Sequence, residues 1–346
     1  MSKFNGSYNE WDDLEEVIIG SALGAQRSKI GIDQLVIEYN NPSSIDIYET
    51  GPFPQKVIEE TEEDLEKLIE ELVKLKIKVK RPSYIDHQSE ISTHDWKTNG
   101  FYNYCPRDSI LVIGDNIIEA PMTMRSRFLE QFSYKTILIE YLKNGAKWFS
   151  APKPRLLDEI YNTNPNTLGL NNLEPIFDAA NIIRAGKDLF YLISNTGNEL
   201  GAFWLQNILG EKFNINICKN IYNGIHIDST ISFLRPGLVL LNPERVNDQN
   251  IPEKLKKWDK IWCPEIVDTG FVGKRPLSST WVGMNIFMLN PHLAIVDSKQ
   301  KELIKKLEQN KIEVLPLIIR HARTLGGGFH CVTLDTRRKS KLENYF

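Results

Sequence analysis

One pattern recurs along the chain and limits what it can fold into: two short apolar segments flank a tight turn. It occurs in four stretches: SILVIGDNIIEAP (109–121), ANIIRAGKDLFYLIS (180–194), STISFLRPGLVLLNP (229–243) and MNIFMLNPHLAIVD (284–297). Turn residues such as Gly114 and Gly186 stand at their centres, and this arrangement predicts β-hairpins. The fold must therefore accommodate several separate hairpins.

Helical segments and further short strands follow the hairpins. Apolar residues at helical spacing predict three helices, over 124–143, 198–209 and 299–310, the second with Asn198 as its cap and Gly210 as its stop. Short strands are predicted over 212–218, 260–264 and 311–317. A less regular copy of the unit combines strand 15–21 with a helix over 61–76, which begins at a Thr-Glu-Glu-Asp cap.

Five units of roughly 40 to 60 residues result, related in shape and not in sequence. A repeat of this length favours a closed, radially symmetric arrangement, and an open mixed α/β sheet of one or two domains is the alternative. No linker rich in Gly, Ser or Pro and no block of charge marks a domain boundary within the 346 residues. The pattern alone leaves both architectures open.

Composition narrows the function classes. The net charge of −3 argues against a nucleic-acid surface or an anionic membrane as partner. We find neither a run of about 18 apolar residues nor the apolar core of a secretory signal, so we expect a cytoplasmic protein. The 4 cysteines and 6 histidines are scattered, without CxxC or HExxH. We therefore expect no disulfide framework and no metal site.

Two aspartates stand just before predicted hairpins. Asp108 lies in CPRDS (105–109), where a turn or capping role is the alternative. Asp178 lies in EPIFDAANI (174–182), between Phe177 and two alanines, so it is expected to be partly buried and to need a partner. Functional groups often sit on loops that strands hold rigid, and both residues fit that placement.

The stretch NGIHIDST (223–230) alternates polar and apolar residues. In an extended strand His226 and Asp228 would share one face, and the two isoleucines the other. A structural histidine is the alternative. Near the C-terminus, LGGGFHC (325–331) allows a sharp bend and close approach to a ligand, because glycine has no Cβ. Cys331 there is either a small buried residue or a nucleophile.

Together these residues fit one reaction. A cysteine nucleophile needs a base and a group that orients the base, and Cys331, His226 and Asp178 supply these three. Asp108 and Asp228 would repel each other unless a cation lay between them, and a guanidinium matches carboxylates well. The inferred chemistry is attack of a thiolate on a guanidinium carbon, with arginine as substrate. We expect His226 to pair with the thiolate and make Cys331 unusually reactive.

At this point the chain resembles the amidinotransferase family, which includes glycine amidinotransferase and the inosamine-phosphate amidinotransferases. The resemblance runs nearly end to end and is carried by several long motifs in one order: NEWDDLEEVIIGSA (9–22), CPRDSILVIGDNIIEAPM (105–122), GAKWFSAPKP (145–154), EPIFDAANIIRAGKDLF (174–190), HIDSTISFLRPGLVLLNPER (226–245) and LGGGFHCVTLDTRR (325–338). It implies a single-domain α/β propeller of five pseudo-symmetric ββαβ units over residues 1–346.

The resemblance also implies a ping-pong reaction. Cys331 would take the amidino group of L-arginine and release ornithine, and an amine would then accept the group. His226 would be the general acid and base, oriented by Asp178. Substrate would be bound by four residues: Asp108 and Asp228 at the guanidinium, Arg245 at the carboxylate, and Asn223. No metal or organic cofactor is implied, and a homodimer is compatible with the family.

The chain departs from the family pattern at two positions, with Asn181 where an aspartate is expected and Val332 where a tryptophan is expected. The proposed nucleophile, base and guanidinium-binding carboxylates are all present. The resemblance leaves the acceptor open: we expect glycine or another small primary amine, because the sequence offers no evident basic cluster for a phosphate. An amino-cyclitol phosphate or a natural-product amine is the alternative. Arginine deiminase-like hydrolysis and a non-catalytic arginine-binding protein are the other readings.

Overall fold

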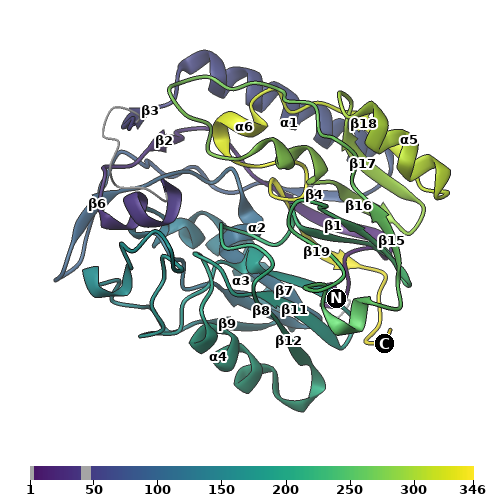
Figure 1. Cartoon of the computed structure of the whole chain (residues 1–346). Coiled ribbons are helices and arrows are strands. Elements are labelled where there is room, and N and C mark those ends of the chain that lie inside the picture. Colours follow the sequence, from purple (N-terminus) through teal and green to yellow (C-terminus); the bar gives the residue numbers. More distant parts are fainter. Residues whose placement is uncertain (1–3, 40–47) are drawn as a thin grey trace.

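Five three-stranded sheets with one pairing scheme organise the computed structural model, which describes residues 4–39 and 48–346 (Figure 1). In each sheet the middle strand pairs antiparallel with one neighbour and parallel with the other. In sheet order, the strands are β19 (Thr333–Arg338), β1 (Leu14–Ile19) and β4 (Lys78–Lys80); β7 (Ile110–Ile113), β8 (Asn116–Glu119) and β9 (Lys147–Ser150); β10 (Ile182–Ala185), β11 (Asp188–Leu192) and β12 (Asn214–Cys218); β13 (Ile231–Arg235), β14 (Leu238–Leu241) and β15 (Asp259–Trp262); and β16 (Phe287–Asn290), β17 (Leu293–Asp297) and β18 (Glu313–Leu317).

The four predicted hairpins are confirmed, and their strands are almost wholly buried. The turn residues Gly114 and Gly186 have φ values of 54° and 67°, a left-handed conformation that glycine adopts without steric cost. Apolar runs buried on both faces explain why these strands lack alternation of polar and apolar residues. The hairpins therefore form locally, as their sequences indicate.

The fifth sheet joins the two ends of the chain. Strand β19 pairs antiparallel with β1, with Leu334 opposite Ile18, and β4 adds a parallel edge. In Figure 1 the N- and C-terminal ends accordingly lie on the same side of the molecule. This pairing brings the segment before β1 close to the cysteine segment before β19.

A helix links the second and third strands in four of the five units. These helices are α1 (Gln55–Lys74), α3 (Lys135–Lys143), α4 (Glu199–Leu209) and α5 (Lys301–Gln309), and α1, α4 and α5 lie at the periphery in Figure 1. Between β14 and β15 the structure has only the 3₁₀ turn Glu253–Leu255. That unit therefore departs from the expected ββαβ pattern.

Two helix boundaries differ from the sequence expectation. Helix α1 begins at Gln55, directly after Pro54, and Thr61 lies inside it, where its hydroxyl donates to the Val57 carbonyl at 2.6 Å. The predicted helix 124–143 is broken into two 3₁₀ segments, Arg125–Arg127 and Glu130–Tyr134, followed by α3. Buried arginine side chains in the first segment bind distant groups, and this contact pattern replaces regular helix.

Other expectations hold. The Asn198 side chain accepts a hydrogen bond from the Gly201 amide at 2.9 Å and so caps α4, which ends at Gly210 with φ of 62°. The remaining short elements are β2 (Gln26–Arg27), β3 (Gly51–Pro52), β5 (Glu90–Ser92), β6 (Lys97–Asn99), α2 (Pro106–Ser109) and α6 (Ala322–Leu325). Among the described residues, no helix has the length and apolar character required to cross a membrane.

Candidate active site

All seven site residues expected from the sequence line one cavity of about 890 Å³: Asp108, Asp178, Asn223, His226, Asp228, Arg245 and Cys331. Most of them occupy the same place in successive units, just before the first strand of a hairpin. Asp108 precedes β7, Asp178 precedes β10, and Asp228 precedes β13, while Cys331 precedes β19. The repeated hairpins thus deliver side chains from distant parts of the chain to a common point.

Cys331 is held on both its main-chain and side-chain atoms. Its amide donates to Oδ1 of Asn285 at 3.0 Å, and the His330 amide donates to the same oxygen at 2.9 Å. Its Sγ atom donates to Oδ2 of Asp228 at 3.3 Å. Asn285, which precedes β16, therefore completes the set of residues that stand before a strand in each unit.

The glycines before Cys331 are required by the packing of the protein. A Cβ at Gly327 would lie 2.6 Å from Sγ of Cys105, and one at Gly328 would lie 2.8 Å from Cβ of Asn285. Such approaches are far inside normal contact distance, so neither position accepts a side chain without a shift. The glycine run thus lets the cysteine segment pack closely against the two neighbouring units.

His226 lies between two carboxylates. Its Nε2 atom is 3.1 Å from Oδ2 of Asp178, and its Nδ1 atom is 3.5 Å from Oδ1 of Asp108. The amide and hydroxyl of Thr123 both donate to the other Asp178 oxygen at 3.0 Å, which fixes that carboxylate. Burial lowers the pKa of His226, but Asp108, Asp178 and Asp228 raise it more, so the net shift is upward.

The expected strand over 223–230 is wrong, because this segment is an irregular loop that ends in a turn. The Ile225 carbonyl accepts hydrogen bonds from the hydroxyls of Ser194 and Thr196, both at 2.7 Å, and this side-chain pairing replaces a sheet ladder. His226 and Asp228 nevertheless both line the cavity, while Ile227 is completely buried. Ile225 lines the same cavity, so the expected separation of polar and apolar residues onto two faces holds for Ile227 but not for Ile225.

Asp108 has a protein cation beside it that sequence reasoning missed. Arg127 donates from Nη1 to Oδ2 of Asp108 at 2.9 Å, and its other nitrogens hold Glu130 at 2.8 to 3.0 Å. Oδ1 of Asp108 is buried and has no hydrogen-bond partner within the described chain. A buried acceptor without a donor is costly, so this oxygen is suited to a donor that a ligand brings.

The resting state of Cys331 differs from the expected thiolate–imidazolium pair. A hydrogen bond with Cys105, burial and the nearby Asp228 carboxylate all raise the pKa of the Cys331 thiol well above its ordinary value. The sulfur is therefore a neutral thiol that donates its proton toward Asp228, and it carries no charge to pair with His226. A positive charge introduced between the carboxylates would offset part of this upward shift.

Arg245 provides a cation at the cavity wall. Its guanidinium lies over the Tyr222 ring at 3.7 Å and donates from Nη1 to the hydroxyls of Ser229 and Thr230 at 3.0 and 2.9 Å. No carboxylate of the described residues forms an ion pair with it. Its direct contacts are neutral oxygens and the ring, while Glu244 and Asp228 act on it only from a longer distance, an arrangement that suits an incoming carboxylate.

The two departures from the family pattern have structural explanations. The Asn181 amide donates to the Leu192 carbonyl and the Ser194 hydroxyl, both at 2.9 Å, and accepts from the Thr196 hydroxyl at 2.8 Å. An ionised aspartate could not donate, so asparagine fits this set of partners. Val332 is fully buried in the apolar core beside the cysteine segment.

Several residues of the site gave little signal in the sequence. Asn285 could have been found, because it precedes a strand like the other site residues. Arg127 and Thr123 act through contacts that no local pattern shows. His330, the neighbour of Cys331, also belongs to this group, because its Nδ1 atom lies 2.9 Å from Oδ2 of Asp228. Among the described residues, no group of three or more His, Cys, Asp or Glu side chains is arranged to hold a metal ion.

Known proteins resemble the chain closely. It is 52% identical over 340 residues to inosamine-phosphate amidinotransferase 1 of Streptomyces glaucescens, with 98% of each chain covered. It is 36% identical to L-arginine:L-lysine amidinotransferase of Pseudomonas savastanoi pv. phaseolicola, covering 98% of this chain and 96% of that one. The solved structure of an inosamine-phosphate amidinotransferase from Streptomyces griseus superposes with a TM-score of 0.96 at 49% identity, covering 99% of both chains. No protein-family model matches the chain.

Identities of this size over nearly complete chains define the protein as an enzyme that transfers groups, with the fold of its structural relative. The chain belongs to the amidinotransferase family.

Proposed function

We propose that residues 1–346 form one catalytic domain, a ring of five ββαβ-type units, that transfers the amidino group of L-arginine to an amine through Cys331. The convergence of the acidic residues, His226 and Cys331 on one cavity supports this proposal. The observation that carries it is the buried, unpartnered Oδ1 of Asp108, which faces His226 in a cavity also lined by Asp228. A guanidinium has five N–H donors and a permanent positive charge, so it satisfies both carboxylates.

Binding of the guanidinium would also activate the nucleophile. The carboxylates of Asp228 and Asp108 contribute to the raised pKa of Cys331, and a cation between them offsets this contribution. The thiol proton passes to solvent as the sulfur bonds to the guanidinium carbon. The protonated form of His226, which its raised pKa favours, gives a proton to the departing nitrogen, and the carbon–nitrogen bond breaks. Ornithine and an amidino-cysteine are the products.

The second half reaction reverses the roles. Neutral His226 takes a proton from the incoming amine, whose nitrogen attacks the amidino carbon. The carbon–sulfur bond breaks, and the Cys331 thiolate regains a proton from solvent to give the resting thiol. Asp178 orients the His226 ring through its 3.1 Å contact. Arg245 binds the carboxylate of arginine, and Asn223 contacts substrate from the loop before His226. The protons gained and lost over the two halves balance.

The acceptor requires a correction. We expected glycine or another small amine, but relatives at about half identity are inosamine-phosphate amidinotransferases, so an amino-cyclitol phosphate is the better supported acceptor. The cavity wall contains a cationic side chain, Arg275, that the sequence did not identify as a possible phosphate-binding residue. Arg275 donates to the main-chain carbonyls of Glu38 and Tyr39 at 2.9 and 3.3 Å. A phosphate could compete for these donors.

Two measurements test the proposal. Mass spectrometry of protein treated with arginine alone should show an amidino adduct on Cys331 together with released ornithine. A panel of an aminocyclitol phosphate, glycine and lysine should then show which amine discharges the adduct. Citrulline formed without any amine would contradict transfer and indicate a hydrolase. Absence of both adduct and ornithine with every acceptor would indicate a protein that only binds arginine.

A further inference from the structure

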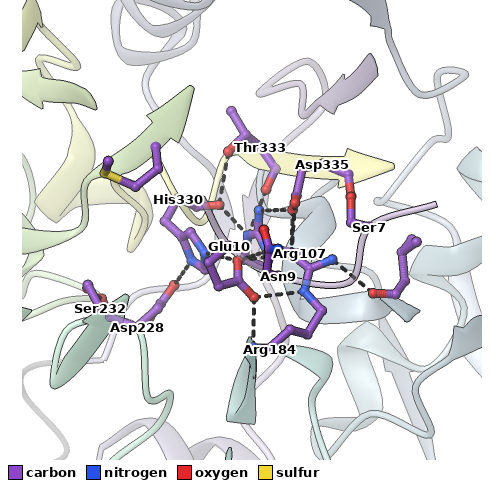
Figure 2. Close-up of polar contacts among 12 residues, drawn as sticks. Ser7, Asn9, Glu10, Arg107, Arg184, Asp228, Ser232, His330, Thr333 and Asp335 are labelled. Carbon is purple, nitrogen blue, oxygen red and sulfur yellow. Dashed lines mark hydrogen bonds and ion pairs between the residues drawn. The ribbon is translucent and has the colours of Figure 1, made fainter. Parts of the chain in front are cut away.

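His330 connects the nucleophile to a buried group of charges from the other end of the chain. Figure 2 shows its ring between two carboxylates, with Asp228 on one side and Glu10 on the other. Nδ1 is 2.9 Å from Oδ2 of Asp228, and Nε2 is 3.3 Å from Oε2 of Glu10. The same Asp228 oxygen accepts the Cys331 thiol at 3.3 Å. A single carboxylate oxygen thus joins His330 to the proposed nucleophile.

Both ring nitrogens of His330 face carboxylate oxygens. A neutral imidazole has one donor and one acceptor nitrogen, so it would direct a lone pair at one of the two carboxylates. Glu10 is ionised, because Arg184 and the His330 hydrogen bond overcome the effect of burial and lower its pKa well below the ordinary value. Against the effect of burial, the pKa of Asp228 is also lowered, first by the hydrogen bond and charge of His330 itself and then by His226. Two ionised acceptors call for two donors.

Glu10 is itself rigidly fixed. Arg184 of β10 donates to Oε1 at 2.7 Å and to Oε2 at 2.9 Å, and the Arg184 amide donates to Oε1 at 3.0 Å. Arg184 also binds Asp335 of β19 at 2.7 Å, as seen on the right of the cluster in Figure 2. Glu10 and Arg184 are 5% and 1% exposed, so solvent screens these contacts little.

Other charged groups facing this arrangement come from several elements. Arg107 of α2 donates from Nε to the His330 carbonyl at 2.8 Å and lies 3.6 Å from Glu10. His226 contributes to the lowered pKa of Asp228 from the opposite side. The small space beside Asp228 and His330 is lined by Glu10, by Ser232 and by apolar side chains that include Ile231, Phe233 and Met288. Charges interact strongly in such surroundings.

We propose that His330 is a positioning residue: a buried imidazolium, held by Glu10, that keeps Asp228 ionised and aimed at the Cys331 sulfur and the substrate guanidinium. This rests on the proposed function, in which Cys331 is the nucleophile. His330 touches neither substrate nor reacting atoms, and it acts only through Asp228. Glu10 lies in the segment that precedes β1, so this N-terminal segment helps to support the active site.

Two conservative variants separate the roles. His330→Asn places an amide donor near the position of Nδ1, so it can still contact Asp228, but it has no charge and cannot reach Glu10. Glu10→Gln keeps the shape and removes the negative charge. His321→Asn is the matched control, because His321 also pairs with a glutamate, Glu60, at 2.7 Å but does not line the cavity.

The first measurement needs no substrate. In ¹⁵N-labelled protein the His330 ring signals, assigned by their loss in His330→Asn, should show both nitrogens protonated at pH 7. Glu10→Gln should convert the ring to the singly protonated form at that pH. A singly protonated ring in the unaltered protein would overturn the proposal, whether or not arginine reacts with Cys331. This readout therefore separates failure of the positioning role from failure of the proposed function.

The second measurement is the rate of amidino-cysteine formation with arginine against pH. His330→Asn should slow it about 10- to 100-fold near neutral pH, the range for losing one charge-assisted hydrogen bond. Removing the cation raises the pKa of Asp228, so the acidic limb should move to higher pH and the deficit should narrow as the pH rises. Glu10→Gln should act in the same direction, and His321→Asn should match the unaltered protein. An unchanged acidic limb in His330→Asn, or a loss that is equal at every pH, would contradict the proposal.

Discussion

Nη1 of Arg127 donates to Oδ2 of Asp108 at 2.9 Å, in a part of the protein where both side chains are about 5% exposed. The same guanidinium binds Glu130 through two nitrogens, so one buried cation serves two buried carboxylates. The pairing explains how the site can hold Asp108 in place before substrate arrives. It leaves the second Asp108 oxygen without a hydrogen bond, with only His226 Nδ1 at 3.5 Å beside it.

Replacing Arg127 by methionine should therefore destabilise the fold strongly. Removal of one partner from a buried ion pair typically costs about 3–5 kcal/mol, because the remaining charges lose their compensation. Denaturant unfolding of Arg127→Met measures this loss. Arg337→Met is the control, since Arg337 pairs with Glu15 at an exposed position and should cost roughly 0–1 kcal/mol. Equal losses in the two variants would contradict the role given to Arg127.

The raised pKa of His226 predicts the pH dependence of the first half reaction. The departing nitrogen requires protonated His226, so adduct formation should fall as the pH rises through that pKa, which lies above the ordinary 6.5. Asp178 contributes to the upward shift, and Asp178→Asn should lower the pKa and move this descending limb to lower pH. Single-turnover rates with arginine over a pH series measure it. A descending limb at the same pH in both proteins would be inconsistent with the pairing.

The structure predicts that Cys331 reacts slowly in the absence of ligand. Its raised pKa leaves little thiolate at pH 7, so alkylation should speed up only at high pH. Asp228→Asn removes one carboxylate that raises this pKa, and alkylation at pH 7 should become about 10-fold faster per unit of lowered pKa. Peptide mass mapping after timed alkylation gives the rate. Asp259→Asn, at an exposed position away from the cavity, should change nothing.

The repeated hairpins could be predicted because their information is local: a turn residue between two apolar segments is sufficient. The pairing of β19 with β1 could not, because it joins strands more than 300 residues apart. The site residues could be grouped by chemistry, yet the sequence does not show which cation balances which carboxylate. Arg127 for Asp108 and His330 for Asp228 emerge only when the units pack together.

The errors have similar causes. Alternation over 223–230 is typical of a strand, but the hydroxyls of Ser194 and Thr196 bind the Ile225 carbonyl and hold a loop instead. The thiolate expected at Cys331 followed from a nearby histidine, whereas the structure places Asp228 and Cys105 against the sulfur. In both cases tertiary contacts decide between alternatives that the sequence pattern cannot separate.

Asn285 should affect the rate more than the binding of arginine. Its Oδ1 atom accepts the amides of both His330 and Cys331, so Asn285→Ala leaves the buried Cys331 amide without a partner, while the His330 amide keeps only its 3.3 Å contact with the Asn285 main-chain carbonyl. An unsatisfied buried group costs about 1–3 kcal/mol, and the cysteine segment would relax to avoid that cost. We expect kcat to fall about 10- to 100-fold, with a smaller change in KM for arginine. A change confined to KM would contradict this positioning role.

Arg275 should distinguish acceptors. If the acceptor carries a phosphate, the guanidinium of Arg275 is a cation on the cavity wall that can bind it, since its hydrogen bonds go to the neutral carbonyls of Glu38 and Tyr39. Arg275→Gln should raise KM for an aminocyclitol phosphate about 10- to 100-fold, the range for one charge-assisted hydrogen bond. The rate of adduct formation with arginine should stay the same.

Comparing acceptors with and without a phosphate in the Arg275→Gln variant isolates the contribution of phosphate binding. An aminocyclitol without phosphate lacks the group that Arg275 would bind, so its KM should be equal in the unaltered protein and in Arg275→Gln. Arg235→Gln is the matched control, because Arg235 also donates to a main-chain carbonyl, that of Asn310 at 3.0 Å, but does not line the cavity. If Arg275→Gln weakened both acceptors equally, its role would be to shape the cavity wall and not to bind phosphate, and the acceptor's charge would have to be recognised elsewhere.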